Sequence, residues 1–164
     1  MHPFSDHIWN MKSALKEAET AFTLDEVPVG AVLLASQGSI ISKAHNLKEK
    51  THNPLGHAEI LAISTGAKTR ENWRLTDCWL YVTLEPCVMC MGALVQSRIA
   101  GVVFGAYDIK GGAISTGHMI HNHPFLNHRF PVLGGIEHYS CSRILSQFFK
   151  ERRSRYKNQN LQNS

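Results

Sequence analysis

The spacing of apolar residues divides the chain into helical and extended segments. Near the N-terminus, apolar residues recur every three or four positions, which is the period of a helix with one buried face. These residues are Ile8, Met11, Leu15, Ala18 and Phe22. Residues 29–35 and 40–44 are instead short apolar runs on either side of Gln37-Gly38, and this pattern predicts a hairpin of two strands.

After the hairpin, helical and extended patterns alternate along the chain. The expected elements are a helix at 57–67, a buried strand at 79–84, a helix at 88–98, a buried strand at 99–104, a loop with one short helix at 105–131, a short strand at 136–139 and a final helix ending near Lys157. Alternation of this kind favours parallel strand pairs in a sheet that helices cover on both faces. We therefore expect an α/β fold, a three-layer α/β/α sandwich with a mixed central sheet that is antiparallel at the first hairpin.

Length and composition are those of a globular protein. The chain has 164 residues, of which 43% are hydrophobic and 18% charged, enough to bury a core without disulfides. We expect one domain over residues 1–157 and a disordered polar tail at 158–164. Because no apolar run approaches the roughly 20 residues that cross a bilayer, and because no signal-peptide core is evident, we expect no membrane partner and a cytoplasmic location.

Positive charge is concentrated in the final helical segment. The formal net charge is only +4, from 17 Lys and Arg against 13 Asp and Glu. Six basic residues nevertheless lie close together there: Arg143, Lys150, Arg152, Arg153, Arg155 and Lys157. A basic helix is usually a solvated face, but here Phe148 and Phe149 lie beside the charges. Phosphate contacts next to an aromatic platform suit single-stranded RNA, so we favour RNA contact for Arg152, Arg153 and Lys157. We expect Phe148 to lie in the core, whereas Phe149 could lie in the core or contact RNA.

Two short motifs stand at the starts of predicted helices. One is His57-Ala58-Glu59, and the other is Pro86-Cys87-Val88-Met89-Cys90. Cys87 and Cys90 are about one helical turn apart, so both can reach a single ion. Helix N-termini also favour the thiolate, which is the form that binds metal. One histidine with two thiolates suits zinc, and we predict a zinc site formed by His57, Cys87 and Cys90.

Three protein ligands leave the fourth tetrahedral position open to solvent. Water bound at such a position is acidified toward neutral pH and becomes a nucleophile. Glu59, two residues from His57, is the natural group to take the proton from water and deliver it to a substrate. The two motifs together therefore predict a hydrolytic enzyme in which Glu59 is catalytic.

Other interpretations of these residues remain open at this point. A closed structural zinc site needs a fourth protein ligand, for which Cys78, Cys141 or a histidine are candidates. A redox role for the two motif cysteines leaves the histidine and the glutamate unexplained. The loop also carries four histidines, which suggest a second metal site or contact with substrate or a partner subunit: His118, His121, His123 and His128. Their spacing fits no standard metal cluster.

With its flanking segments, the zinc motif resembles that of the bacterial tRNA-specific adenosine deaminases, within the cytidine and deoxycytidylate deaminase superfamily. The resemblance extends over about residues 5–157. The segments that carry it are Glu26–Val32, Asn46, Leu80–Cys90, Ser97–Ile99, Val103–Ala106, Asp108, Asn127–Arg129 and Phe148-Phe149. The zinc motif is specific for the superfamily, and the flanking segments narrow the resemblance to the tRNA branch.

The resemblance implies both a reaction and a set of binding residues. It implies that a homodimer with one zinc per subunit converts the wobble adenosine of an arginine tRNA anticodon loop to inosine and releases ammonia. It also implies that Asn46 hydrogen-bonds the flipped nucleoside and that the segment around Asp108 contacts the neighbouring nucleotide. The final helix, with Phe149, Arg152 and Arg153, would line the anticodon loop. From the residues alone, Asn46 is equally a turn former and Asp108 an ordinary loop aspartate.

Three departures from the family pattern and two alternative functions complete the expectations. Leu55-Gly56 stands where the family has small or hydroxyl residues, and Met91 stands in place of an alanine; both affect packing near the zinc. Tyr107 stands in place of an arginine and affects contacts beside Asp108. One alternative is a deaminase of free guanine or a cytosine nucleoside, against which the basic helix argues. The other is a non-catalytic, zinc-stabilised RNA-binding module, against which Glu59 and the missing fourth ligand argue.

Overall fold

The computed structural model describes residues 4–162 as five strands, four α-helices and one 3₁₀ helix. In chain order these are α1 (Phe4–Thr23), β1 (Gly30–Ala35), β2 (Ile40–His45), α2 (Ala58–Thr69), β3 (Cys78–Leu84), α3 (Val88–Gln96), β4 (Gly101–Ala106), η1 (Ile120–Asn122), β5 (Val132–Leu133) and α4 (His138–Gln162). The expected hairpin, the two buried strands and the helices between them are all present, with shifts of one or two residues at their ends. No helix within residues 4–162 is both long and apolar enough to cross a membrane.

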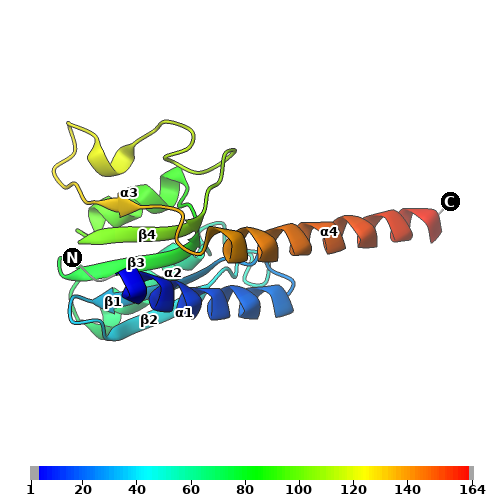
Figure 1. The fold of residues 1–164 in the computed structure, drawn as a ribbon, viewed down its shortest axis with the longest axis horizontal. Helices are drawn as coiled ribbons and strands as arrows, with labels where there is room; N and C mark the ends of the chain where they lie inside the picture. The colour runs from blue at the N-terminus through cyan, green and yellow to red at the C-terminus, as the bar shows by residue number, and fades with distance from the viewer. Residues whose placement is uncertain (1–3, 163–164) are drawn as a thin grey trace.

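One mixed sheet forms the centre of the molecule, with strand order β2-β1-β3-β4-β5 (Figure 1). β1 pairs antiparallel with both β2 and β3, whereas β3–β4 and β4–β5 are parallel. The parallel β3–β4 pair flanks α3, as expected of strands joined through a helix. The predicted mixed sheet, antiparallel at the first hairpin, is confirmed.

Helices cover both faces of this sheet, and the strand residues alternate between them. In β1, Ala31 and Leu33 pack into the core beneath α2 and α3, while Val32 and Leu34 pack beneath α1 and α4. All six residues of β1 and of β4 are buried, as expected of strands covered on both sides. The three-layer α/β/α sandwich predicted from the sequence is therefore confirmed.

Two expectations near the C-terminus were wrong. The short strand lies at Val132–Leu133, where it pairs with β4, and not at 136–139. Glu137 has a positive φ of 55°, which ends the extended chain, and α4 begins at the next residue. The helix then continues through Gln162, five residues beyond its expected end near Lys157. No Gly or Pro lies between its ends to stop it; residues 163 and 164 lie outside the described part of the chain.

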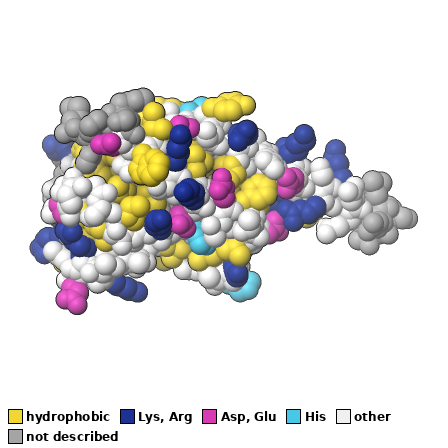
Figure 2. All heavy atoms as spheres, turned by 60° about the horizontal axis from the view of Figure 1, so that its bottom comes forward, with side chains coloured by type: hydrophobic (Ala, Val, Ile, Leu, Met, Phe, Trp, Pro, Cys, Tyr) yellow, Lys and Arg dark blue, Asp and Glu magenta, His cyan; other side chains and the backbone are white. Residues whose placement is uncertain are grey.

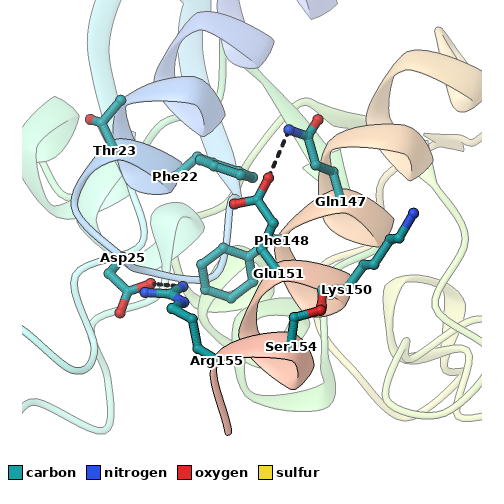
Figure 3. A pocket seen from close by; sticks show the side chains of 9 residues that line it. All are labelled: Phe22, Thr23, Asp25, Gln147, Phe148, Lys150, Glu151, Ser154 and Arg155. Carbon is teal, nitrogen blue, oxygen red and sulfur yellow. Dashed lines mark hydrogen bonds and ion pairs between the residues drawn. The ribbon is translucent and has the colours of Figure 1, made fainter. Parts of the chain in front are cut away.

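α4 is anchored to α1 near its middle and then projects beyond the sheet (Figure 1). Figure 3 shows the junction, where the ring of Phe148 meets that of Phe22 edge-on at a centroid distance of 5.6 Å. Arg155 donates to Asp25 at 2.6 Å beside these rings. Phe148 is 1% exposed, which confirms its predicted place in the core. This ion pair is exposed, so the aromatic contact and not the charge pair fixes the helix.

α1 lies directly on β1 at Gly30, and this close contact leaves no room for a larger residue. A Cβ on Gly30 would overlap the backbone of Ala14 and Ala18, which cannot move without displacing α1. We expect Gly30→Ala to lower the free energy of unfolding by at least about 3 kcal/mol, and hence to lower Tm by at least about 6 °C. Calorimetry would measure this. Gly92→Ala is the control, because its Cβ would meet no atom of the chain. An unchanged Tm in the first variant would contradict the packing described.

Candidate zinc and nucleobase site

The N-terminal ends of α2 and α3 present the side chains of the two sequence motifs to one another. His57 and Cys87 occupy the N-cap positions, with extended backbones at φ −75°, ψ 145° and φ −74°, ψ 173°. Neither side chain caps its own helix, so both are available to a ligand beyond the helix ends. Cys90 follows one turn into α3 and is fully buried.

The structure brings the three predicted ligand side chains together. The Nδ1 atom of His57 lies 3.7 Å from the Sγ atom of Cys87 and 3.6 Å from that of Cys90. All three ligand atoms lie within 4.8 Å of one another. Zinc bonds of about 2.0–2.3 Å in a tetrahedron separate neighbouring ligand atoms by about 3.3–3.8 Å, so the donor set and its spacing fit zinc.

Within the described residues, no fourth His, Cys, Asp or Glu joins this group. Cys78 lies at the start of β3 and contacts Asp77, while Cys141 packs in the core on the opposite face of the sheet. Neither of the two cysteines considered as a closing ligand is therefore in place. The group is one suited to a metal with one coordination position left for water or substrate.

The two thiols of the group carry different charges. The pKa of Cys87 is lowered to about 4, chiefly because its thiolate accepts a hydrogen bond from Cys90, with help from His57. The pKa of Cys90 is raised far above its usual range by that same hydrogen bond and by burial. Hydrogen bonding to Cys87 also raises the pKa of His57. The protein alone thus holds one thiolate, and a second requires a bound cation.

Glu59 lies inside the site and holds its proton more tightly than an ordinary carboxyl group. Its side chain is 4% exposed, and this burial raises its pKa to about 7. A carboxyl group that gains and loses a proton near neutral pH is suited to proton transfer in both directions.

A cavity of about 190 Å³ opens in front of these groups. Its lining comprises Val27, Val29, Asn46, Lys48, His57, Ala58, Glu59, Leu84, Glu85, Cys87 and Asp108. The lining thus combines apolar side chains with the polar groups of the predicted metal site. The volume is below the roughly 300–1,000 Å³ of pockets for drug-sized ligands, which suits one small planar group.

Asn46 and Asp108 both lie in this cavity wall, as expected from the family pattern. The Nδ2 atom of Asn46 donates to Glu26 at 3.1 Å, which leaves its amide oxygen available to a donor on a bound base. Glu26 is fully buried and also accepts from the backbone nitrogens of Glu49 and Lys50. Its importance was missed from the sequence, because a carboxylate whose partners are backbone amides leaves no charge pattern to find.

A wider groove of about 700 Å³ adjoins the cavity and shares Val27, Leu84 and Asp108 with it. Its remaining lining residues are Tyr107, Ile109, Lys110, Leu145, Ser146, Phe149 and Arg153. Phe149 is 42% exposed there. The groove therefore offers an exposed aromatic ring and two cationic side chains beside the small cavity.

Adjacent residues of α4 face different ways. Arg153 lines the groove, but the guanidinium of Arg152 lies 5.7 Å over the ring of Phe148, on the side nearer α1. Figure 2 shows Lys and Arg side chains on both sides of the projecting helix, with fewer acidic ones among them. Of the two arginines expected to bind RNA, only Arg153 thus shares a groove with Phe149 and Asp108.

The histidine-rich loop and the departures from the family pattern lie outside the zinc group. None of the four loop histidines belongs to a cluster that could hold a metal in the described part of the chain. Leu55 is 53% exposed, whereas Met91 lies on α3 and is buried in the core. Tyr107 packs edge-on against Phe104 with 4.9 Å between ring centroids, and lines the groove beside Asp108. An aromatic side chain therefore stands where a cationic one was expected.

Comparisons with known proteins agree with this site. The family model of the cytidine and deoxycytidylate deaminase zinc-binding region matches residues 4–106. The chain is 46% identical to the tRNA-specific adenosine deaminase of Bacillus subtilis (strain 168) over 147 residues, which cover 90% of this chain and 91% of that protein. It is 45% identical to the protein of the same name from Haemophilus influenzae, over 90% of this chain and 85% of that protein.

A solved structure is similar as well. It comes from a study of A-to-I editing by tRNA:A34 deaminases at the wobble position of transfer RNA. It superposes with a TM-score of 0.79 at 38% identity and covers 83% of this chain and 98% of its own. The fold of this chain, its three clustered ligands and its match to these relatives over most of the sequence all indicate the same family. The chain belongs to the cytidine and deoxycytidylate deaminase family, in the tRNA-specific adenosine deaminase branch.

Proposed function

We propose that this protein deaminates the wobble adenosine in a tRNA anticodon loop, so that adenosine and water become inosine and ammonia. The observation that carries the proposal is the three-ligand group with Glu59 beside it, in a cavity of about 190 Å³ that adjoins an aromatic, basic groove. The relatives named tRNA-specific adenosine deaminase support the choice of substrate.

The side chains of the cavity divide the chemical work. Bound zinc supplies a water molecule acidified toward neutral pH. Glu59 takes a proton from the attacking water, delivers it to N1 of the adenine and then assists the departure of ammonia from C6. The raised pKa of Glu59 matches this double role. Asn46, whose amide is oriented by Glu26, holds the base against the attacking water.

The size of the cavity and the character of the groove suit loop RNA. A flipped base enters the small cavity, and the bases of an anticodon loop are already partly unstacked, which lowers the cost of flipping. The neighbouring nucleotides then lie in the groove, where Phe149 provides a stacking surface and Lys110 and Arg153 face phosphates. Arg152 remains a candidate for phosphate contact on the adjacent face of α4.

We also propose a homodimer with one zinc per subunit, acting in the cytoplasm where tRNA is modified. Support for an association surface comes from large apolar side chains exposed on the segment between β4 and β5. Phe125 is 91% exposed and Met119 47%. Exposed apolar side chains gathered on one segment are typical of a surface that another subunit covers.

The proposal is tested by comparing substrates. Wild-type protein is incubated with an anticodon stem-loop RNA that carries adenosine at the wobble position and, separately, with free adenosine, guanine and cytidine. We expect ammonia release and inosine from the RNA only. Turnover of a free base or nucleoside with none on RNA would favour the small-molecule deaminase, and release from none of them would favour a non-catalytic module.

Removal of the proton-transfer group should separate metal binding from catalysis. We expect Glu59→Ala to retain one zinc per chain by elemental analysis, because the three ligands are intact. Its kcat on the stem-loop RNA should fall by at least about 10²–10⁴-fold, the usual contribution of general acid–base catalysis. Near-normal turnover in this variant would remove Glu59 from the mechanism.

Zinc affinity should depend on pH in a defined direction. Cys87 is already a thiolate at neutral pH, but zinc must displace the proton that the raised pKa keeps on Cys90. A rise in pH reduces this competition and also removes the proton that the raised pKa keeps on His57, so the apparent zinc association constant should increase by at least about tenfold per pH unit between pH 6 and 8, most steeply at the acid end. Competition with a chromophoric chelator measures it. The control Cys141→Ala should show the same dependence of zinc affinity on pH as wild type, and Cys87→Ala should lose most of the metal. A zinc affinity that does not vary with pH would contradict a protonated Cys90 in the metal-free protein.

The groove assignment predicts different roles for arginines of the same helix. We expect Arg153→Ala to weaken binding of the stem-loop RNA and to reduce the slope of log K against log salt concentration by about 0.7, the loss of one phosphate contact to single-stranded RNA. Arg143→Ala is the matched control, because Arg143 is exposed on the side of α4 that faces α1. Equal slopes for the two variants would show that RNA does not follow the groove.

A further inference from the structure

Glu85 is a buried carboxylate in the cavity wall to which the proposed chemistry gives no task. It follows the last residue of β3 and precedes Pro86 and the zinc ligand Cys87. Its side chain is 3% exposed and lines the cavity. Among the described residues, no Lys or Arg forms an ion pair with it. A buried carboxylate without a cationic partner must be satisfied by hydrogen-bond donors.

Those donors all come from the loop that follows β4. Oε1 of Glu85 accepts from the backbone nitrogens of Ile114 at 2.8 Å and Ser115 at 2.7 Å. Oε2 accepts from the backbone nitrogen of Asp108 at 3.0 Å and from the hydroxyl of Ser115 at 2.5 Å. One carboxylate therefore ties the two ends of segment 108–115 to the end of β3.

The same loop is shaped to fit around this carboxylate. A Cβ added to Gly112 would overlap the carboxyl group of Glu85. Gly112 also forms a bridge with Cys87, and the backbone nitrogen of Ala113 donates to the oxygen of Pro86 at 2.9 Å. The loop thus lies directly against the segment that carries a zinc ligand, and Glu85 fills the space that the missing side chain of Gly112 leaves.

Asp108 stands where this loop meets both the cavity and the groove. Its Oδ1 atom accepts from the backbone nitrogens of Lys110 and Gly111, both at 3.1 Å, so its side chain is fixed relative to its own loop. The backbone nitrogen of Glu85 holds the end of β4 by donating to the oxygen of Ala106 at 2.8 Å, and beyond that point the bond from the backbone nitrogen of Asp108 to the Glu85 side chain holds Asp108 toward the zinc ligands.

We propose that Glu85 is a positioning residue that holds loop 108–115 against the zinc-binding end of α3 and so sets Asp108 at the boundary between cavity and groove. This inference rests on the proposed function, because Asp108 matters to catalysis only if RNA lies in the groove. A loop held in place before RNA arrives needs no ordering during binding, so the effect falls on KM more than on kcat.

Replacement of Glu85 by glutamine separates the two halves of this contact. The amide oxygen still accepts from Ile114 and Ser115, but the amide nitrogen cannot accept from the backbone nitrogen of Asp108. Glu85→Gln therefore releases the Asp108 end of the loop while keeping a side chain of the same size. Gly112→Ala disturbs the same contact from the loop side. Asp77→Asn is the matched control, since Asp77 precedes β3 at its other end and contacts exposed Arg70.

The first measurement needs no substrate. In zinc-loaded Gly112→Ala, amide hydrogen exchange at Asp108, Ile114 and Ser115 should be at least about tenfold faster than in wild type. In zinc-loaded Glu85→Gln, the same acceleration should appear at Asp108. Asp77→Asn should exchange there as wild type does, and all variants should keep one zinc per chain. Unchanged exchange at Asp108 in both loop variants would overturn the inference, whatever the substrate of the protein.

The second measurement uses the anticodon stem-loop RNA. We expect Glu85→Gln and Gly112→Ala to raise KM about tenfold or more with a smaller change in kcat. The double variant Glu85→Gln/Asp108→Ala should be no worse than Asp108→Ala alone, because Glu85 acts through Asp108. Losses that multiply in the double variant would overturn the inference. If wild type and Asp77→Asn form no inosine, the proposed function fails and with it the role of Glu85 in RNA binding, while the exchange result still decides whether Glu85 holds the loop.

Discussion

The convergence of two helix N-termini at one edge of the sheet is the constraint on which the site depends. Because His57 and Cys87 occupy the N-cap positions of α2 and α3, neither side chain is committed to its own helix. Both helices pack on the same face of the sheet, so their ends are held at a distance that the sheet sets. The predicted zinc ligands meet because the buried strands hold those two helix ends close together. Because only three protein ligands meet there, one coordination position faces the cavity.

Charge explains why this arrangement needs a metal. The protein stabilises one thiolate at Cys87 through the neighbouring thiol and imidazole, but the second proton stays on Cys90. A divalent cation held by His57, Cys87 and Cys90 would stabilise the second thiolate, and the two thiolate charges would balance its own. Glu59 is buried beside it, where low solvent exposure raises the pKa toward neutrality. Burial thus helps to keep the proton on Cys90 in the absence of metal, and it also prepares the carboxyl group of Glu59 for proton transfer.

The sequence predicted the parts of the site that depend on local position, and missed those that depend on distant backbone. His57, Cys87 and Cys90 were predictable because each stands in the first turn or at the cap of a recognisable helix. Glu26 and Glu85 were not identified as site residues because their partners are backbone amides of loops far along the chain, which have no residue signature.

The α/β/α sandwich was predictable from the alternation of helical and extended patterns, whereas the two-residue strand β5 is too short to show a period. Arg152 and Arg153 look alike in sequence, and only the packing of Phe148 against α1 shows which of them faces the groove.

A crystal structure of the zinc-loaded protein, with the metal located by its anomalous signal, tests the central claim most directly. The account predicts three protein ligands, two sulfur atoms at about 2.3 Å and one nitrogen at about 2.0 Å. It predicts water in the fourth position, within about 2.6–3.2 Å of a carboxylate oxygen of Glu59. A fourth side chain on the zinc, or a Glu59 carboxylate turned away from that water, would contradict it.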